Sequence, residues 1–437
     1  MKHVICLLCC LTLVVGLFQE ANAQVTLQSV EEAVIMVRQH NTDLQAARQT
    51  AQWQAGAVEV TKTGKLPTLK AISALEYNYA LPVQLVPAEF LGGEAGQFRK
   101  LQFGVPFNMT AGLEAGYGLV NPTLSHDIKL AELNHQIAEK QVAAQQDQLE
   151  TQVIRSYYLG ILSREAMLIT AQNLQNADTL LVLAQERYTA GLIEELDLNR
   201  AQSTRLTLAD QLAQNELAYV NNLRQLRLLV GQEVDIATDA ARSWSEQVSI
   251  IQFLVVDEYP QIKLKVAQRT YFQAAIDREQ ATRLPQVSLY GRYTAQAQRQ
   301  TFNFLNFREP WFSIGVVGVR LDVPIFNGGV RLRNLDRAKI RADITQTELV
   351  AERQRQQAQD EEWLSSYQQA RKSLEFSERN NDLAARNMEL AMIKYQAGVY
   401  TYDQYITIFN ETLQAQNRYL RTLADSLIYG SLLQSRR

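Results

Sequence analysis

Apolar residues recur at spacings of three and four along two very long stretches of this chain, residues 122–188 and 330–395. After Pro122 the first stretch has no further proline and only one glycine, Gly160, and the second stretch has neither residue. At a rise of about 1.5 Å per residue, each would extend on the order of 100 Å, whereas the average globular helix has about 11 to 12 residues. The pattern therefore predicts coiled-coil helices.

The first of these helices carries two narrow apolar seams, with many Ala, Gln and Glu residues between them. These residue types favour helix but do not fill a dry core. Two seams predict two helical neighbours and leave one side wet, as in a wall of helices around water. The first seam contains Leu124, Ile128, Ala131, Ala138, Val142 and Leu149, and the second contains Leu130, Leu133 and Ile137.

Each long helix runs into a Tyr-x-Ala-Gly sequence, and a new helical pattern follows at once. The two segments are RYTAGLIEELD at 187–197 and KYQAGVYTYDQ at 394–404. Because glycine readily adopts the left-handed conformation that closes a helix, Gly191 and Gly398 are predicted at the tips of helical hairpins. The first returning helix is expected to stop at Gly231. A simple kink is the alternative at each site.

Before each long helix lie two stretches in which apolar and polar residues alternate, as expected for half-exposed strands. Runs of about 10 to 13 residues with tyrosines near their ends are typical of tilted membrane-spanning strands with an aromatic girdle. An ordinary soluble hairpin in each half is the alternative. A polar, glycine-rich loop is expected at 81–106. The alternating stretches are residues 68–80, 108–120, 285–298 and 310–323, the last being the least regular.

The chain is an internal duplication. Gly191 aligns with Gly398 at an offset of about 207, and Pro67 aligns with Pro285 at about 218. Each of these prolines ends a preceding helical segment, at 27–62 and 261–282. The period is too long for a solenoid. We expect a first repeat at 24–232 and a second at 233–437.

Residues 1–23 have the pattern of a secretory signal peptide. Lys2 precedes an apolar run from Val4 to Phe18, and the small-residue cleavage site at 21–23 follows. A membrane anchor is the alternative, but the run is short for one. All three cysteines lie in this segment without a lipoprotein pattern, so we expect no lipidation and a mature chain without thiols.

Composition and motifs argue against catalysis and against nucleic-acid binding. The net charge is −3, and no basic stripe with interleaved aromatics occurs. After the leader, no run of 18 apolar residues predicts a membrane-spanning helix. Among the histidines His40, His126 and His135, the last two are too far apart to share a helical metal-binding face. With no nucleophile, phosphate-loop or metal motif, we expect no enzyme activity, no cofactor and no metal.

Taken together, these features resemble the TolC family of outer-membrane efflux proteins over nearly the whole mature chain. The duplication, KLPTL and RLPQV before the strands, and LDVPIFNGGVRLRNLDRAKI at 321–340 carry the resemblance. A further motif is the glycine followed six residues later by aspartate, at Gly191 and Asp197.

What the resemblance implies is a mainly α fold with a membrane β-barrel contribution. Each protomer of a homotrimer would give four transmembrane strands to one twelve-stranded barrel, while coiled-coil helical hairpins form a periplasmic α-barrel. Four strands alone cannot close a barrel, and lipid does not tolerate open strand edges. The implied function is the passive exit duct of a tripartite efflux or type I secretion system. It would lie in outer-membrane lipid, extend into the periplasm, and work with a periplasmic adaptor (membrane fusion) protein and an inner-membrane transporter.

The resemblance also implies that the hairpin tips at Gly191 and Gly398 form the periplasmic aperture and dock the adaptor. Asp197 matches the aperture aspartate of the family, with Glu194 and Glu195 nearby. A ring of such acids from three subunits would favour cations. The alternatives are a solvated loop for the two glutamates and a helix N-cap for Asp197.

In the second repeat, Tyr395 matches the tyrosine that precedes the family's tip glycine. Three positions depart from the family pattern. Tyr400 stands where some members carry arginine, and Gln404 and Thr407 stand where aspartates are expected, with Asp403 one residue early. These departures put a charge-based gate in question.

A coiled-coil structural or adhesive protein of the cell envelope is the alternative function. Such a rod has no use for four alternating segments with aromatic ends. A pore that works alone is disfavoured, because simple porins have short turns on the periplasmic side.

Overall fold

The computed structural model of this chain describes residues 25–237, 256–306 and 308–436, so the predicted signal peptide lies outside the described residues. The chain divides into two compact units. The first contains the segment up to Thr50 with residues 138–266 and 348–437, and the second contains residues 51–137 and 267–347. Within the described ranges, no helix is long and apolar enough to cross a membrane.

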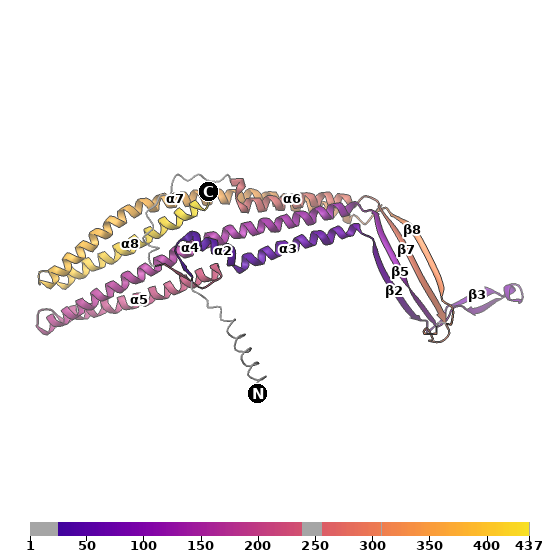
Figure 1. Cartoon of the computed structure of the whole chain (residues 1–437), viewed down its shortest axis with the longest axis horizontal. Coiled ribbons are helices and arrows are strands. Elements are labelled where there is room, and N and C mark those ends of the chain that lie inside the picture. The colour runs from indigo at the N-terminus through magenta and orange to yellow at the C-terminus, as the bar shows by residue number, and fades with distance from the viewer. Residues whose placement is uncertain (1–24, 238–255, 307, 437) are drawn as a thin grey trace, which may run out of the picture. The chain divides into compact units, whose positions relative to one another are not determined.

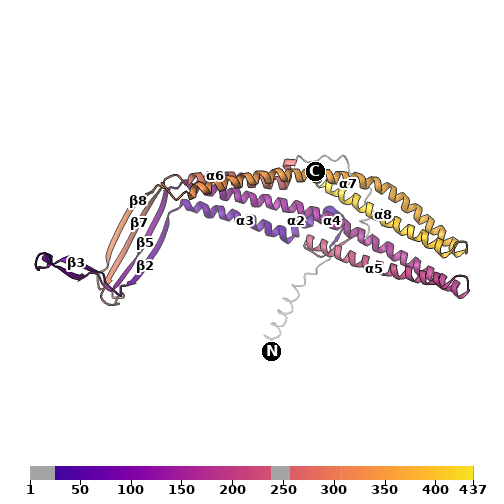
Figure 2. The same ribbon diagram turned by 180° about the vertical axis from the view of Figure 1, so that it is seen from behind.

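The first unit contains the two helical hairpins that the glycine motifs predict, apart from residues 122–137 of α4 and 330–347 of α7, which belong to the second unit. In both views α4 runs beside α5, and α7 runs beside α8 (Figure 1, Figure 2). The long helices predicted at 122–188 and 330–395 are confirmed, as is the end of the first returning helix before Gly231, whose φ is 77°. The bounds are Pro122–Thr189 for α4, Glu195–Val230 for α5, Val330–Gln396 for α7 and Tyr402–Gln434 for α8.

The prediction of a single helix over residues 27–62 is wrong, because the segment forms two helices that are separated at Asn41. The Asn41 side-chain oxygen accepts the N–H of Leu44 at 2.9 Å, and its amide nitrogen donates to the Leu229 carbonyl at 2.8 Å. This buried side chain therefore starts the next helix and fastens it to the end of α5. The two helices are α2 (Val30–His40) and α3 (Thr42–Lys62), and the helix predicted at 261–282 is confirmed as α6 (Pro260–Ala281).

The hydrophobic core of this unit lies around a short parallel pair of strands. β1 (Val25–Leu27) pairs with β6 (Val234–Ile236), a pairing that the sequence did not predict. Fully burying an aliphatic side chain contributes about 1.5–3 kcal/mol, so this cluster fixes the arrangement of the helices around it. Its completely buried side chains include Leu27, Ala33, Val37, Leu44, Val153, Leu226, Val230 and Leu432.

A second feature of this unit is a buried charge cluster around Arg436. The guanidinium lies 4.6 Å from the ring centre of Tyr259 and 5.0 Å from that of Trp363. One oxygen of Asp147 and one of Asp360 each lie 3.7 Å from it, and the Tyr259 hydroxyl donates to Asp360 at 2.7 Å. Burial raises the pKa of both aspartates, and the positive charge of Arg436 opposes that rise only in part.

The second unit contains a four-stranded antiparallel sheet in the order β2-β5-β7-β8. The four predicted strands are confirmed, and the two hairpins join through β5 and β7 into one sheet. β2 and β8 lie at the two edges, each with one side unpaired within the described chain. The bounds are Thr68–Tyr77 for β2, Phe107–Val120 for β5, Gln286–Arg299 for β7 and Phe312–Asp322 for β8.

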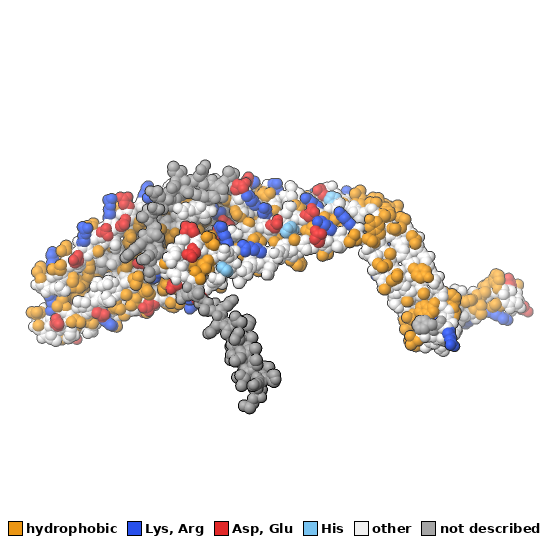
Figure 3. Space-filling model, in the orientation of Figure 1, with side chains coloured by type: hydrophobic (Ala, Val, Ile, Leu, Met, Phe, Trp, Pro, Cys, Tyr) orange, Lys and Arg blue, Asp and Glu red, His pale blue; other side chains and the backbone are white. Residues whose placement is uncertain are grey.

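The two faces of this sheet differ in chemistry, because side chains alternate along each strand. In Figure 3 the sheet surface turned toward the viewer shows mostly hydrophobic and uncharged side chains. From the strand register, the apolar face includes Leu69, Leu75, Leu113, Tyr117, Leu289, Tyr293, Val317 and Val319. The polar face includes Lys70, Glu76, Asn108, Thr110, Glu114, Arg292, Gln296, Gln298 and Arg320.

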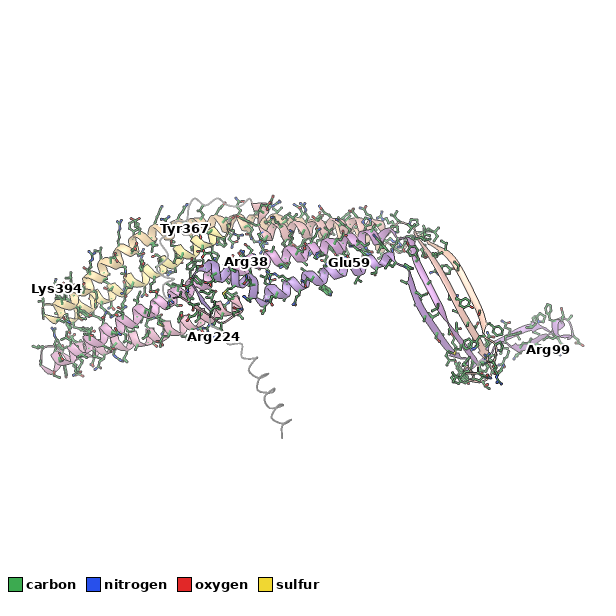
Figure 4. All side chains as sticks on the ribbon, in the orientation of Figure 1. Arg38, Glu59, Arg99, Arg224, Tyr367 and Lys394 are labelled. Atoms are coloured by element: carbon green, nitrogen blue, oxygen red, sulfur yellow. The ribbon has the colours of Figure 1, made fainter. Side chains whose placement is uncertain are left out.

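The prediction of a loop at 81–106 is wrong in part, because this segment contains a second small hairpin. β3 (Val83–Pro87) pairs with β4 (Phe98–Gln102), and a short 3-10 helix, Ala88–Leu91, lies between them. Figure 4 marks Arg99 on this hairpin. Between α4 and α3, the His135 ring nitrogen lies 3.1 Å from the Ala51 carbonyl oxygen, so this histidine has a structural contact.

Candidate functional site at the hairpin tips

The two tips have the same backbone conformation. Gly191 and Gly398 adopt φ values of 72° and 75°, so both predicted hairpin turns are confirmed. In each tip, the N–H of the residue after the glycine donates to the carbonyl oxygen five residues earlier. The N–H of the glycine itself donates to the carbonyl oxygen three residues earlier, and the two bonds together form a Schellman motif. The four bonds are Leu192 to Arg187 (2.9 Å), Gly191 to Tyr188 (3.0 Å), Val399 to Lys394 (2.9 Å) and Gly398 to Tyr395 (3.1 Å).

The returning helices begin differently. At the start of α8, the Thr401 hydroxyl oxygen accepts the backbone N–H of Gln404 at 3.3 Å. In return, the Gln404 side-chain oxygen accepts the backbone N–H of Thr401 at 3.0 Å, and the two bonds form a capping box. Gln404 therefore has a structural role where the resemblance expects an aspartate. At the start of α5 the N-cap is Glu194, without a side-chain bond. The N-cap alternative for Asp197 is wrong, because this residue is the third residue of the helix and lies in its first turn.

Arg200 brings two of the predicted acids together. Its Nη1 lies 2.6 Å from an Asp403 carboxylate oxygen and 3.7 Å from an oxygen of Asp197. Because the Arg200 side chain is 45% exposed, solvent screening keeps each pair weak, at roughly 0–1 kcal/mol. We missed Arg200 in the sequence, although its spacing of three from Asp197 is typical of an ion pair on one helical face.

Arg187 forms the stronger link between the two hairpins. Its guanidinium carbon lies 4.4 Å from the ring centre of Tyr395, and Nη2 donates to the backbone carbonyls of Tyr395 and Gln396. The last carbonyls of a helix lack helical donors and carry partial negative charge, so a cation is favoured there. Arg187 is the first residue of the first tip motif, but no pattern in the sequence indicates that its side chain reaches the end of α7.

Tyr395 belongs to a buried aromatic cluster between the hairpins. Its ring lies 5.4 Å from that of Tyr405 and 6.5 Å from that of Tyr402, and Phe409 stacks on Tyr405 at 6.2 Å. Tyr395 is fully buried, and the hydroxyl oxygens of Tyr395 and Tyr405 make no hydrogen bond. Burial raises the pKa of both tyrosines, so they remain neutral. In this structure the Tyr395 side chain is therefore packed inside the chain and is not exposed at the surface of the tip.

The other predicted residues lie at the surface of the tips. Lys394, labelled in Figure 4, donates to the Tyr400 hydroxyl at 3.3 Å and lies over its ring. Glu194 and Glu195 are exposed. Across the described part of the chain, no three His, Asp or Glu side chains gather as possible metal ligands.

Each tip also exposes one large apolar side chain directly after its glycine. Leu192 is 74% exposed and Val399 is 68% exposed. We did not single out these residues in the sequence, although their matching position in the two repeats was visible.

Comparison with known proteins agrees with this architecture. A family model described as outer membrane efflux protein matches residues 33–232 and 255–428. The pyoverdine export outer membrane protein OpmQ of Pseudomonas aeruginosa is 26% identical over 272 residues, which are 57% of this chain and 52% of OpmQ. The match thus spans about half the length of that relative.

Two solved structures share the fold. The MtrE outer membrane channel of Neisseria gonorrhoeae, in its open state, has a TM-score of 0.71 at 16% identity, covering 93% of this chain and 88% of MtrE. The outer membrane protein VceC of Vibrio cholerae has a TM-score of 0.67 at 18% identity, covering 93% of this chain and 95% of VceC. At these identities the similarity is one of fold.

Proposed function

Because this chain belongs to the outer membrane efflux protein family, we propose that it is the outer-membrane exit duct of a tripartite efflux or type I secretion system. It would conduct solutes passively, with energy supplied by an inner-membrane transporter and with a periplasmic adaptor between the two. We also propose that residues 24–232 and 233–437 are its two repeats, exported by the signal peptide at 1–23.

The observation that carries this proposal is the four-stranded sheet. Its apolar face is suited to lipid and its polar face to water, while β2 and β8 leave their outer edges unpaired. Unpaired strand edges are not tolerated in a bilayer, and small membrane barrels need about eight strands. Three copies joined edge to edge would give twelve strands, so the sheet supports a homotrimer with one shared barrel.

The hairpin tips are the proposed periplasmic aperture. Asp197, Glu194 and Glu195 would surround the axis of the trimer and favour cations. Leu192 and Val399 would dock the adaptor through their exposed apolar side chains. Within each protomer, Arg187 and Arg200 hold the two hairpins together, which would keep the aperture narrow until a partner separates them.

Single-channel recording of the purified chain in planar bilayers tests this function. The wild-type protein should conduct ions. A wild-type protein that shows no conductance would contradict the proposed function as a duct. Asp197→Ala should lower the preference for cations, whereas Arg200→Ala, which removes the cation that neutralises Asp197 and Asp403, should raise it. Identical reversal potentials for all three proteins would contradict the acidic aperture.

A further inference from the structure

The polar face of the sheet has a concentrated positive charge near its middle. Lys70 lies directly opposite Glu114 in the strand register, and Glu114 lies directly opposite Arg292. Lys70 Nζ is 3.0 Å from a Glu114 carboxylate oxygen. Since facing residues on neighbouring strands share one face, the three side chains form a single row.

This row has an excess of one positive charge, because two basic residues share one acid. Lys70 uses Glu114, while Arg292 is exposed and has no ion pair among the described residues. The remaining acids of this face lie toward its ends. Glu76 is six residues along β2, or roughly 20 Å away, and Asp322 ends β8. The uncompensated charge of the row is therefore that of Arg292.

We propose that Arg292, supported by Lys70, determines ion selectivity at the level of the sheet and favours anionic solutes there. This inference rests on the proposed function, in which three copies close a barrel with the polar face inward. Twelve strands spaced about 4.8 Å apart and tilted by about 40° enclose a barrel roughly 24 Å across. Guanidinium groups that extend inward from this wall lie within about one Debye length, roughly 8 Å, of the axis.

Three such charges act on every solute that passes, with little screening between them and the axis. The acids proposed at the hairpin tips have the opposite sign and lie in the other unit of the chain. The selectivity of the duct is then a product of two filters, and each filter can be removed by itself. Anionic groups on a solute, such as carboxylates, are the chemistry that the row of Lys70, Glu114 and Arg292 recognises.

The test is the zero-current potential of the full-length protein in planar bilayers under a tenfold KCl gradient. Arg292→Gln should lower the permeability ratio of chloride to potassium by about threefold, and Glu114→Gln should raise it. Opposite shifts from two changes that each remove one charge from the same row cannot come from general damage to the fold. Citrate should block the wild-type current, and Arg292→Gln should require a several-fold higher citrate concentration for the same block.

Arg379→Gln is the matched control, because Arg379 is an exposed arginine on α7 outside the sheet, paired with Glu375. It should leave the permeability ratio unchanged. If Arg292→Gln has no effect, or only the effect of Arg379→Gln, the inference is wrong while the duct stands. If the wild-type protein does not conduct, the duct and this inference are both refuted.

Discussion

Replacing Arg187 by alanine should loosen the tip of the second hairpin although Arg187 belongs to the first. In the structure its guanidinium covers the Tyr395 ring and donates to two carbonyl groups at the end of α7. Alanine removes these contacts and leaves the carbonyls to water. The turn around Gly398 should then open more often.

The magnitude follows from the contacts. A hydrogen bond from a charged group contributes about 1.5–3 kcal/mol when sheltered, and a partly exposed cation–π contact about 0.5–1 kcal/mol. Because Arg187 is only half-buried, we take a net loss of about 2 kcal/mol. Since 1.4 kcal/mol is a factor of ten, the opening constant should rise roughly 30-fold. Arg200→Ala removes only screened ion pairs and should change it less than about fivefold.

Amide hydrogen exchange of the peptide covering residues 393–401 measures this opening. The N–H groups of Ala397, Gly398 and Val399 are hydrogen-bonded in the turn, so their exchange reports its stability. Arg187→Lys, which keeps the charge but loses the planar fork, should lie between wild type and alanine. Equal protection in Arg187→Ala and Arg200→Ala would refute the reasoning, as would faster exchange confined to the first tip.

Two further predictions concern stability. Gly398→Ala should cost about 1 kcal/mol from its positive φ alone, because a Cβ there meets no neighbour. Gly231→Ala should lower the melting temperature much more, since its Cβ would lie 2.5 Å from a backbone oxygen of α2; similar melting temperatures would contradict this. Burial raises the pKa of Asp147 and Asp360, so the folded state binds more protons than the unfolded state between the ordinary aspartate value and the raised one. Stability should therefore increase as the pH falls into that window and decrease as it rises through it, and Asp360→Asn should weaken this dependence in denaturant titrations at several pH values.

Much of the architecture follows from local rules in the sequence. A stretch of 67 or 68 residues with almost no glycine or proline has few alternatives to helix. The tip glycines are the positions at which a residue adopts the left-handed conformation without a steric penalty. Alternation over more than ten residues likewise predicted the strands. The break at Asn41 was missed although asparagine is a preferred N-cap residue, and its second bond, to Leu229, joins residues 188 positions apart and leaves no local signal. The three-residue pairing of β1 with β6 is too short to leave a periodic signal.

The candidate site was harder to predict than the fold. Tyr188 and Tyr395 hold equivalent positions in the two repeats, but the first is 38% exposed and the second is fully buried. Tyr395 is covered by Arg187 and packs against Tyr405 of α8, and these contacts are made by residues that do not neighbour it in the sequence. The two arginines that join the hairpins, Arg187 and Arg200, act over more than 200 residues of sequence, and no spacing rule reaches that far.

The trimer with one shared barrel is the central claim, and native mass spectrometry of the detergent-extracted membrane protein tests it most directly. The unpaired edges of β2 and β8 predict a complex of three identical chains that survives transfer from the membrane and gentle activation in the gas phase. A monomer or a dimer recovered from the soluble periplasmic fraction would contradict the barrel and the duct that depends on it.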